Sequence, residues 1–143
     1  MTKLLLRLKS LLQDARGVSA VEFGFIAPIL VSVVIGTTDA GLVTYRYYDM
    51  DAAVGSGAQY IMRGGSDMSV AQAIVGSGWT TRTDKGAIGV EEFCRCAAKI
   101  AQCSATCADG TSPYGFTTIR VTDTYHGLFV SKDLAASETI RVR

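Results

Sequence analysis

The chain has 143 residues, enough for one domain, and its 48% hydrophobic against 19% charged residues exclude an intrinsically disordered protein. A net charge of +1 removes the usual electrostatic argument for binding nucleic acid, so we expect no nucleic-acid partner. A single His excludes most His-rich metal sites, and only two Pro exclude a Pro-rich linker.

Charge is distributed unevenly along the chain. Residues 1–16 contain Lys3, Arg7, Lys9 and Arg16 against Asp14 alone. No charged residue occurs from Phe23 to Thr38, whereas residues 39–143 carry ten basic and eleven acidic side chains. A basic start, an apolar block and a balanced remainder are typical of an export or anchoring signal.

The apolar block predicts a membrane-spanning helix over residues 18–38, which read VSAVEFGFIAPILVSVVIGTT. A helix of this length is about 32 Å long, close to the hydrocarbon thickness of a bilayer. The basic residues before the block and Asp39 after it predict a cytoplasmic N-terminus and a C-terminus on the far side. Pro28 removes one helical hydrogen bond, which membrane helices tolerate.

Glu22 is the residue that a plain membrane span does not explain. An ionised carboxylate in the apolar phase costs several kcal/mol unless it is paired, so we expect a cationic partner unless Glu22 lies in the headgroup zone. Gly17 directly precedes Val18, and a small residue suits an extended protease subsite. Cleavage between them would create an α-amino group at Val18, one helical turn from Glu22 or facing Glu22 of a neighbouring subunit.

The segment Arg16-Gly17-Val18-Ser19-Ala20-Val21-Glu22-Phe23 resembles the prepilin-peptidase site of type IV pilin-like proteins. Together with Pro28-Ile29-Leu30, Gly36 and Asp39-Ala40-Gly41, it resembles the TadE-like minor pseudopilins of the Flp/Tad branch. Asp39 stands where that family usually has Glu. The resemblance is specific in this N-terminal part and weaker in the rest of the chain.

The resemblance implies that Met1–Gly17 is a leader removed by a prepilin peptidase, and that Glu22 and Phe23 take part in assembly. It further implies a minor pseudopilin of a Tad (type IVc) pilus that acts in pilus assembly, priming or adhesion. The implied partners are the peptidase, other major and minor pilins of the Tad system, inner-membrane lipid and the inner-membrane assembly platform. The implied location is the bacterial inner membrane, with a periplasmic C-terminus, and the extracellular pilus after assembly.

Two other interpretations of the N-terminus stay open. In the first, the chain is an uncleaved single-pass anchor that presents a disulfide-bonded periplasmic interaction domain. In the second, residues 1–38 are an ordinary secretory signal peptide, which needs small residues after the apolar block. Thr38-Asp39-Ala40 is a poor site of that kind, because Asp lies inside it.

The helical pattern continues beyond the apolar block over residues 39–63, as an amphipathic stretch. Apolar side chains recur every three or four positions at Val43, Tyr47, Met50, Val54, Ala58 and Ile61. Gly64-Gly65 is a typical helix stop. We therefore predict one helix over residues 18–63, with an apolar first half and an amphipathic second half.

Residues 64–143 read as a small extracytoplasmic α+β domain. A short helix is predicted over Met68–Val75, capped by Ser66 or Asp67. Alternation with a period of two predicts strands at Ala87–Cys96, Thr117–Tyr125 and Glu138–Arg143. The fold class is therefore α+β and pilin-like: a long helix whose amphipathic half covers one face of a small antiparallel sheet.

The four cysteines, Cys94, Cys96, Cys103 and Cys107, admit disulfides, a zinc site or free thiols. There is no C-x-x-C pair, the spacing typical of both zinc knuckles and thioredoxin-like redox sites. The domain is also predicted to lie outside the cytoplasm, so two disulfides are favoured. Cys94 and Cys96 lie two apart on one strand, near the upper limit for bridging each other. A returning loop favours nested pairing, Cys94 with Cys107 and Cys96 with Cys103.

Residues that could carry catalysis form no recognisable constellation. Glu91-Glu92 is a tandem pair on a strand, so its side chains point to opposite faces. His126 has no neighbouring Cys or Asp signature, Asp109-Gly110 reads as a turn, and Asp123 as a salt-bridge partner. We expect a structural protein rather than an enzyme, with no catalytic residues, no metal, no cofactor and no small-molecule substrate.

Overall fold

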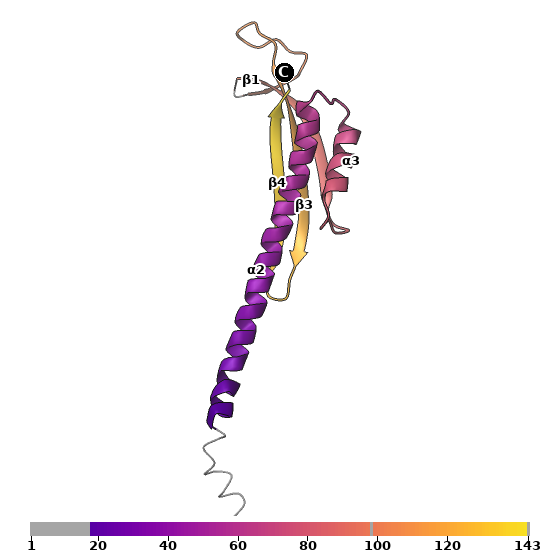
Figure 1. The fold of residues 1–143 in the computed structure, drawn as a ribbon. Helices are drawn as coiled ribbons and strands as arrows, with labels where there is room; N and C mark the ends of the chain where they lie inside the picture. The colour runs from indigo at the N-terminus through magenta and orange to yellow at the C-terminus, as the bar shows by residue number, and fades with distance from the viewer. Residues whose placement is uncertain (1–17, 98, 143) are drawn as a thin grey trace, which may run out of the picture. The chain divides into compact units, whose positions relative to one another are not determined.

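The computed structural model describes residues 18–97 and 99–142 (Figure 1). In chain order the elements are helices α2 (Val18–Met62) and α3 (Met68–Gly78), then strands β1 (Ala87–Cys96), β2 (Lys99–Ala101), β3 (Tyr114–His126) and β4 (Ser131–Arg141). The chain divides into two compact units, Met1–Thr38 and Asp39–Arg143, which are taken separately below. The predicted α+β fold, with a long apolar N-terminal helix and a small antiparallel sheet, is confirmed.

The ends of the two helices are determined by local sequence. Helix α2 stops at Met62, and Gly64 adopts a left-handed backbone with φ of 94° that suits Gly. The N–H of Gly64 donates to the carbonyl of Ile61 at 2.9 Å, which completes the predicted stop. Helix α3 begins after Asp67, whose carboxylate accepts from the N–H of Ser69 at 2.8 Å. The predicted cap is confirmed, and α3 runs three residues beyond the predicted Val75.

The sheet has the strand order β2-β1-β3-β4, and every neighbouring pair is antiparallel. Strand β1 has the predicted bounds, whereas β3 and β4 begin earlier than expected. The early part of β4, Ser131–Ser137, alternates poorly in sequence and is held by pairing with β3 from Arg120 to His126. Strand β2 was not predicted, because three residues are too few to give a periodic signal.

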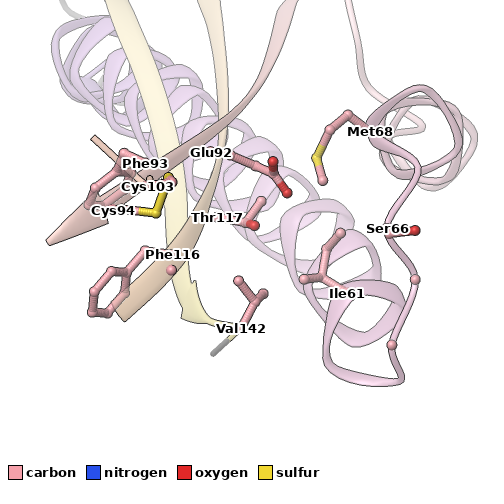
Figure 2. Close-up of a pocket in the computed structure, with 13 residues that line it drawn as sticks. Ile61, Ser66, Met68, Glu92, Phe93, Cys94, Cys103, Phe116, Thr117 and Val142 are labelled. Atoms are coloured by element: carbon pink, nitrogen blue, oxygen red, sulfur yellow. A yellow bond between two sulfur atoms is a disulfide. The ribbon is translucent and has the colours of Figure 1, made fainter. Parts of the chain in front are cut away.

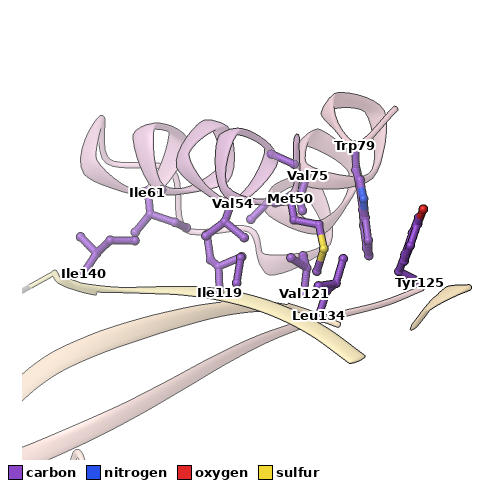
Figure 3. Close-up of a cluster of buried hydrophobic side chains, with 14 residues drawn as sticks. Met50, Val54, Ile61, Val75, Trp79, Ile119, Val121, Tyr125, Leu134 and Ile140 are labelled. Carbon is purple, nitrogen blue, oxygen red and sulfur yellow. The ribbon is translucent and has the colours of Figure 1, made fainter. Parts of the chain in front are cut away.

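The hydrophobic core lies between one face of the sheet and the two helices (Figure 3). Strand β3 supplies Ile119, Val121 and Tyr125, and β4 supplies Leu134, Ala136 and Ile140. Helix α2 contributes Met50, Ala53, Val54, Ala58 and Ile61, while Ala71, Val75 and Trp79 come from α3 and its end. The predicted apolar face of β3 and its cover by the second half of α2 are therefore confirmed.

One position of the predicted helix stripe is wrong. Tyr47 is 44% exposed, whereas Ala53 and Gly57, which the stripe omitted, are buried. Helix α2 contacts α3 as well as the sheet, so its buried face is wider than a single stripe and turns toward Ala53 and Gly57. Arg46 lies over the ring of Tyr125, 5.2 Å from its centroid, on the side of α2 that faces the sheet.

Gly57 lets α2, α3 and β3 approach closely. A Cβ atom at this position would lie 2.5 Å from Cγ2 of Val75 and 3.0 Å from Cδ1 of Ile119. Both neighbours belong to the core and are fully buried, so neither side chain has free space to move into. Gly57 is therefore a packing residue, whereas a Cβ at Gly55 meets nothing within 4 Å.

We predict that Gly57→Ala lowers the free energy of unfolding by about 1–3 kcal/mol, because the added methyl group overpacks the core. Gly55→Ala is the matched control on the same helix and should be neutral or stabilising by up to about 1 kcal/mol. Denaturant unfolding of the full chain in detergent can be followed by the fluorescence of Trp79, the single Trp, which is 3% exposed. Equal stability of the two variants would contradict the packing role of Gly57.

Candidate functional site

The apolar half of α2 has no intramolecular partner within the part of the chain that the structure describes. Glu22 and Phe23 are both exposed, and no residue of the most apolar window of the helix is buried. Exposed large apolar side chains occur at Val21, Phe23, Phe25, Ile26, Ile29, Leu30, Val31, Val33 and Val34. The helix is long and apolar enough to cross a membrane. Such a surface requires lipid or other protein around it.

Three hydroxyl groups in this half of the helix donate to carbonyls of the helix itself. The hydroxyl of Ser32 donates to the carbonyl of Pro28 at 2.8 Å. The hydroxyls of Thr37 and Thr38 donate to the carbonyls of Val33 and Val34 at 3.0 and 2.8 Å. Hydrocarbon supplies no hydrogen-bond partners, so this arrangement suits a segment in lipid.

Glu22 is the only charged side chain in residues 18–38. It lies four residues after Val18, the first residue of α2, and therefore one helical turn along the axis. Gly17 and the rest of the predicted leader, Met1–Gly17, fall outside the described residues, as does the side chain of Val18. The predicted cleavage site and the roles of Glu22 and Phe23 in assembly stay predictions.

Asp39 links α2 to the hairpin between β3 and β4. Its side chain is 5% exposed. The hydroxyl of Tyr125 donates to Oδ1 at 3.0 Å, and the backbone N–H of Phe129 donates to Oδ2 at 2.7 Å. Both donors are more than 80 residues away in sequence. The first residue after the apolar segment is thus a structural part of the second unit, and we call this contact the Asp39 latch.

Gly127 makes room for the latch. A Cβ atom at this position would lie 2.6 to 2.7 Å from the carboxylate atoms of Asp39. The N–H of Gly127 donates to the carbonyl of Val130 at 2.7 Å, which closes the turn between the strands. Any larger residue at position 127 would push the carboxylate away from its two donors.

The latch favours an ionised Asp39 and a neutral Tyr125. The N–H of Phe129 is the main cause that holds the pKa of Asp39 below its usual value, and burial opposes it. Burial, followed by the hydrogen bond to Asp39, raises the pKa of Tyr125. The contribution of the latch to stability is therefore present above the pKa of an unfolded Asp and is lost as the pH falls through the lower pKa of the folded state.

Two further carboxylates hold the loop between α3 and β1. Asp49 on α2 accepts hydrogen bonds from the hydroxyl of Thr80 and from the N–H and hydroxyl of Thr81. Asp123 on β3 accepts from the N–H and hydroxyl of Thr83. Burial opposes ionisation of Asp123, but the Thr83 hydrogen bonds outweigh it and lower the pKa, with a smaller contribution from the charge of Arg46. The predicted salt bridge of Asp123 is therefore not found among the described residues, where its partners are Thr83 and the N–H of Thr124.

The four cysteines form two disulfides, Cys94–Cys103 and Cys96–Cys107, with Cα separations of 5.1 and 5.5 Å. The prediction of two disulfides is confirmed, but the nested pairing is wrong. Strand β2 pairs with β1 so that Ala101 lies opposite Cys94, which brings Cys103 to Cys94 first. The chain then turns, with the N–H of Ala105 bonded to the carbonyl of Gln102, and returns Cys107 to Cys96. The unpredicted strand decided the connectivity.

A cavity of 340 Å³ opens beside the first disulfide, at the end of the sheet near the C-terminus of α2 (Figure 2). Ile61, Met68 and Val142 supply apolar walls, and Glu92 and Thr117 lie side by side on paired strands. The hydroxyl of Thr117 is buried and has no hydrogen-bond partner among the described residues. Glu91 lines the opposite face of the sheet with Thr118 and Arg120, so the tandem carboxylates are separated as predicted.

A family model described as TadE-like protein matches residues 17–59. This part of the chain is TadE-like. The match indicates a Tad pilus-associated protein, in agreement with the resemblance found in the sequence. No curated protein and no solved structure gives a significant match to the chain.

The TadE-like segment contains most of α2, with both Glu22 and Asp39, and ends before the sheet begins. Sequence reasoning used Asp39 to orient the apolar segment and noted it as a departure from the family's Glu, but missed the latch. The signal was an acidic residue at the end of an apolar helix, but its partners were too distant in sequence to identify. The structure brings the four cysteines together, whereas Glu22 has no partner among residues 18–97 and 99–142.

We predict that Asp39→Asn loosens the hairpin, because the amide has no charge to strengthen these hydrogen bonds, and its NH₂ group cannot replace the carboxylate oxygen that accepts from Tyr125 or Phe129. Hydrogen exchange of the Phe129 amide should accelerate by at least about tenfold. Asp51→Asn is the control: Asp51 is an exposed acid on the same helix. Exchange is measured in detergent by mass spectrometry, on the peptide that contains Phe129. Unchanged exchange of that peptide in Asp39→Asn would contradict the latch.

Proposed function

We propose that this protein is a minor pseudopilin of a Tad (type IVc) pilus. One observation carries the proposal: the TadE-like match includes the apolar segment, residues 18–38, whose most apolar window has no buried residue and whose only charged side chain is Glu22, near its start. The helix is held in the inner membrane before assembly and is surrounded by other pilin helices afterwards. The role is structural, with no enzymatic activity, cofactor, nucleic acid or small-molecule substrate.

The proposed mechanism begins with cleavage after Gly17 by a prepilin peptidase at the cytoplasmic face. The new α-amino group of Val18 then provides a cation at the same end of the helix as Glu22. A carboxylate in an apolar environment costs several kcal/mol unless it is paired, so side-by-side association that pairs Glu22 with a neighbour's ammonium is favoured in one axial register.

The second unit, Asp39–Arg143, lies on the periplasmic side in this proposal. The disulfides Cys94–Cys103 and Cys96–Cys107 suit that compartment, where such bonds persist. In the chain-entropy model, closing loops of this size stabilises a domain by up to about 3 kcal/mol each. After assembly this domain is displayed on the pilus, where it takes part in priming or adhesion and contacts other major and minor pilins and the assembly platform.

The mass of the mature N-terminus tests the cleavage. We predict that protein extracted from membranes of the native host starts at Val18. A chain that still starts at Met1 would favour the alternative, an uncleaved anchor that presents the disulfide-bonded domain. A chain that starts near Ala40 would identify a secretory signal peptide, and it would also lack the carboxylate of Asp39 that holds the hairpin.

Substitution of Glu22 tests the assembly step. We predict that Glu22→Ala leaves cleavage after Gly17 largely intact, so that the mature chain still starts at Val18, but impairs pilus assembly, because the ammonium of Val18 loses its partner. Glu22→Asp keeps the charge and should retain part of the assembly, and Ser32→Ala is a neutral control in the same helix. Pilus counts for Glu22→Ala equal to the wild type, from electron micrographs, would remove the register argument.

A further inference from the structure

The turn between β3 and β4 ends in three consecutive exposed apolar side chains. Leu128, Phe129 and Val130 are 72%, 62% and 41% exposed, and we call them the hairpin tip. Water-exposed turns are normally polar, so a run of three large apolar residues costs solubility unless it meets another surface. The prediction from the sequence did not include this feature.

The Asp39 latch holds the hairpin tip close to the residue that follows the apolar segment. The N–H of Phe129 donates to Oδ2 of Asp39 at 2.7 Å, and Asp39 is covalently bonded to Thr38, the last residue of the apolar segment. The tip therefore lies within a few ångströms of the point where the chain leaves that segment, by chain continuity alone. Figure 1 shows the β3–β4 turn beside α2.

The length of the apolar segment then gives the depth of the tip. Residues 18–38 as a helix are about 32 Å long, and the hydrocarbon core of a bilayer is about 30 Å thick. With that segment across the membrane, Asp39 lies at the outer hydrocarbon boundary. The headgroup zone adds about 5–7 Å on each side, and this is the level of the hairpin tip.

The chemistry of the tip suits that zone. Two N–H groups of the turn are already bonded, that of Gly127 to the carbonyl of Val130 and that of Phe129 to Asp39, so these two lose no hydrogen bonds on leaving water. Exposed polar side chains border it: His126, bonded to the hydroxyl of Ser131, and the basic residue Lys132. On α2, Leu42 and Tyr45 are exposed three and six residues past Asp39. Apolar, aromatic and basic side chains together are typical of the membrane interface.

We propose that the Leu128–Val130 tip docks on the periplasmic leaflet of the bilayer that holds the apolar helix. The inference rests on the proposed membrane anchoring of residues 18–38. The protein then has two membrane contacts, one spanning and one interfacial, and the latch fixes the distance between them. Before assembly this second contact holds the sheet domain at the membrane surface.

Quenching of tryptophan fluorescence by brominated lipid tests the docking. The full chain carrying Phe129→Trp is reconstituted in nanodiscs of phosphatidylcholine and phosphatidylglycerol, with bromine near the headgroup end of the acyl chains. Tyr114→Trp is the matched control: Tyr114 is an exposed aromatic residue at the other end of β3, about 40 Å from His126. The unsubstituted protein gives the background from Trp79.

Val34→Trp, at an exposed position inside the apolar segment, separates failure of the inference from failure of the anchor. We expect strong quenching at position 34, at least about half as much at position 129, and background quenching at position 114. Quenching at 34 with background quenching at 129 overturns the docking and leaves the anchor intact. Background quenching at both overturns the anchor as well.

A second variant tests the tip without a new fluorophore. Leu128→Ser with Phe129→Ser should increase hydrogen exchange of residues 126–132 in nanodiscs but not in the protein dissolved in a detergent that leaves the tip wet. Equal effects in both media overturn the docking. Lost pilus assembly by this variant, with background quenching at position 129, would assign the tip to a neighbouring protein subunit instead of lipid.

Discussion

At Asp39, helix α2 changes from an exposed apolar segment to a helix packed on the sheet. The carboxylate of Asp39 binds the β3–β4 hairpin at this point. Before Asp39, no residue of the most apolar window is buried; after it, one face of the helix is covered by the sheet and α3. Asp39 accepts hydrogen bonds from Tyr125 and Phe129, so the far end of the sheet is tied to the residue where the apolar segment ends. The carboxylate of Asp39 leaves no room for a side chain at position 127, so the latch requires Gly in the turn.

The sheet domain is stabilised by two different devices at its two ends. Carboxylates on α2 and β3 hold loops through hydrogen bonds at the end near Asp39, with Asp49 and Asp123 as the acceptors. The disulfides constrain the opposite end, where strand β2 is short and little of the surface is buried. Between the ends, Gly57 allows the helices and β3 to pack closely enough to form one core. A domain of this size needs such additional constraints because its core is small.

The functional argument combines features from both units. The TadE-like match is limited to residues 17–59, which include Glu22, the apolar segment and Asp39. In the proposed function, anchoring and assembly depend on residues of the matched part, whereas the disulfide-bonded sheet lies outside the match. The exposed hairpin tip belongs to the sheet but is held by Asp39 of the matched part. In the proposed pilus role, the latch thus connects the matched segment to the β3–β4 hairpin.

Local patterns were sufficient to predict a large share of the fold. The helix over residues 18–62, its stop at Gly64, the Asp67 cap and strand β1 all follow from periodicity or from one residue's backbone and capping preferences, which act within a few positions. The presence of two disulfides also followed, from the number of cysteines and the expected compartment. These features do not depend on how distant segments pair.

Only the tertiary structure decided the features that depend on register between distant segments. Gly57 is buried and Tyr47 is exposed because the buried face of α2 also contacts α3. The cysteine pairing depended on β2, a strand of three residues. The partners of Asp39 are 86 and 90 residues away, and nothing near Asp39 in the sequence specifies them. The sequence alone therefore determined the long apolar helix, the short helix and strand β1, whereas the pairing of β1 with β2 and of β3 with β4 determined which side chains meet.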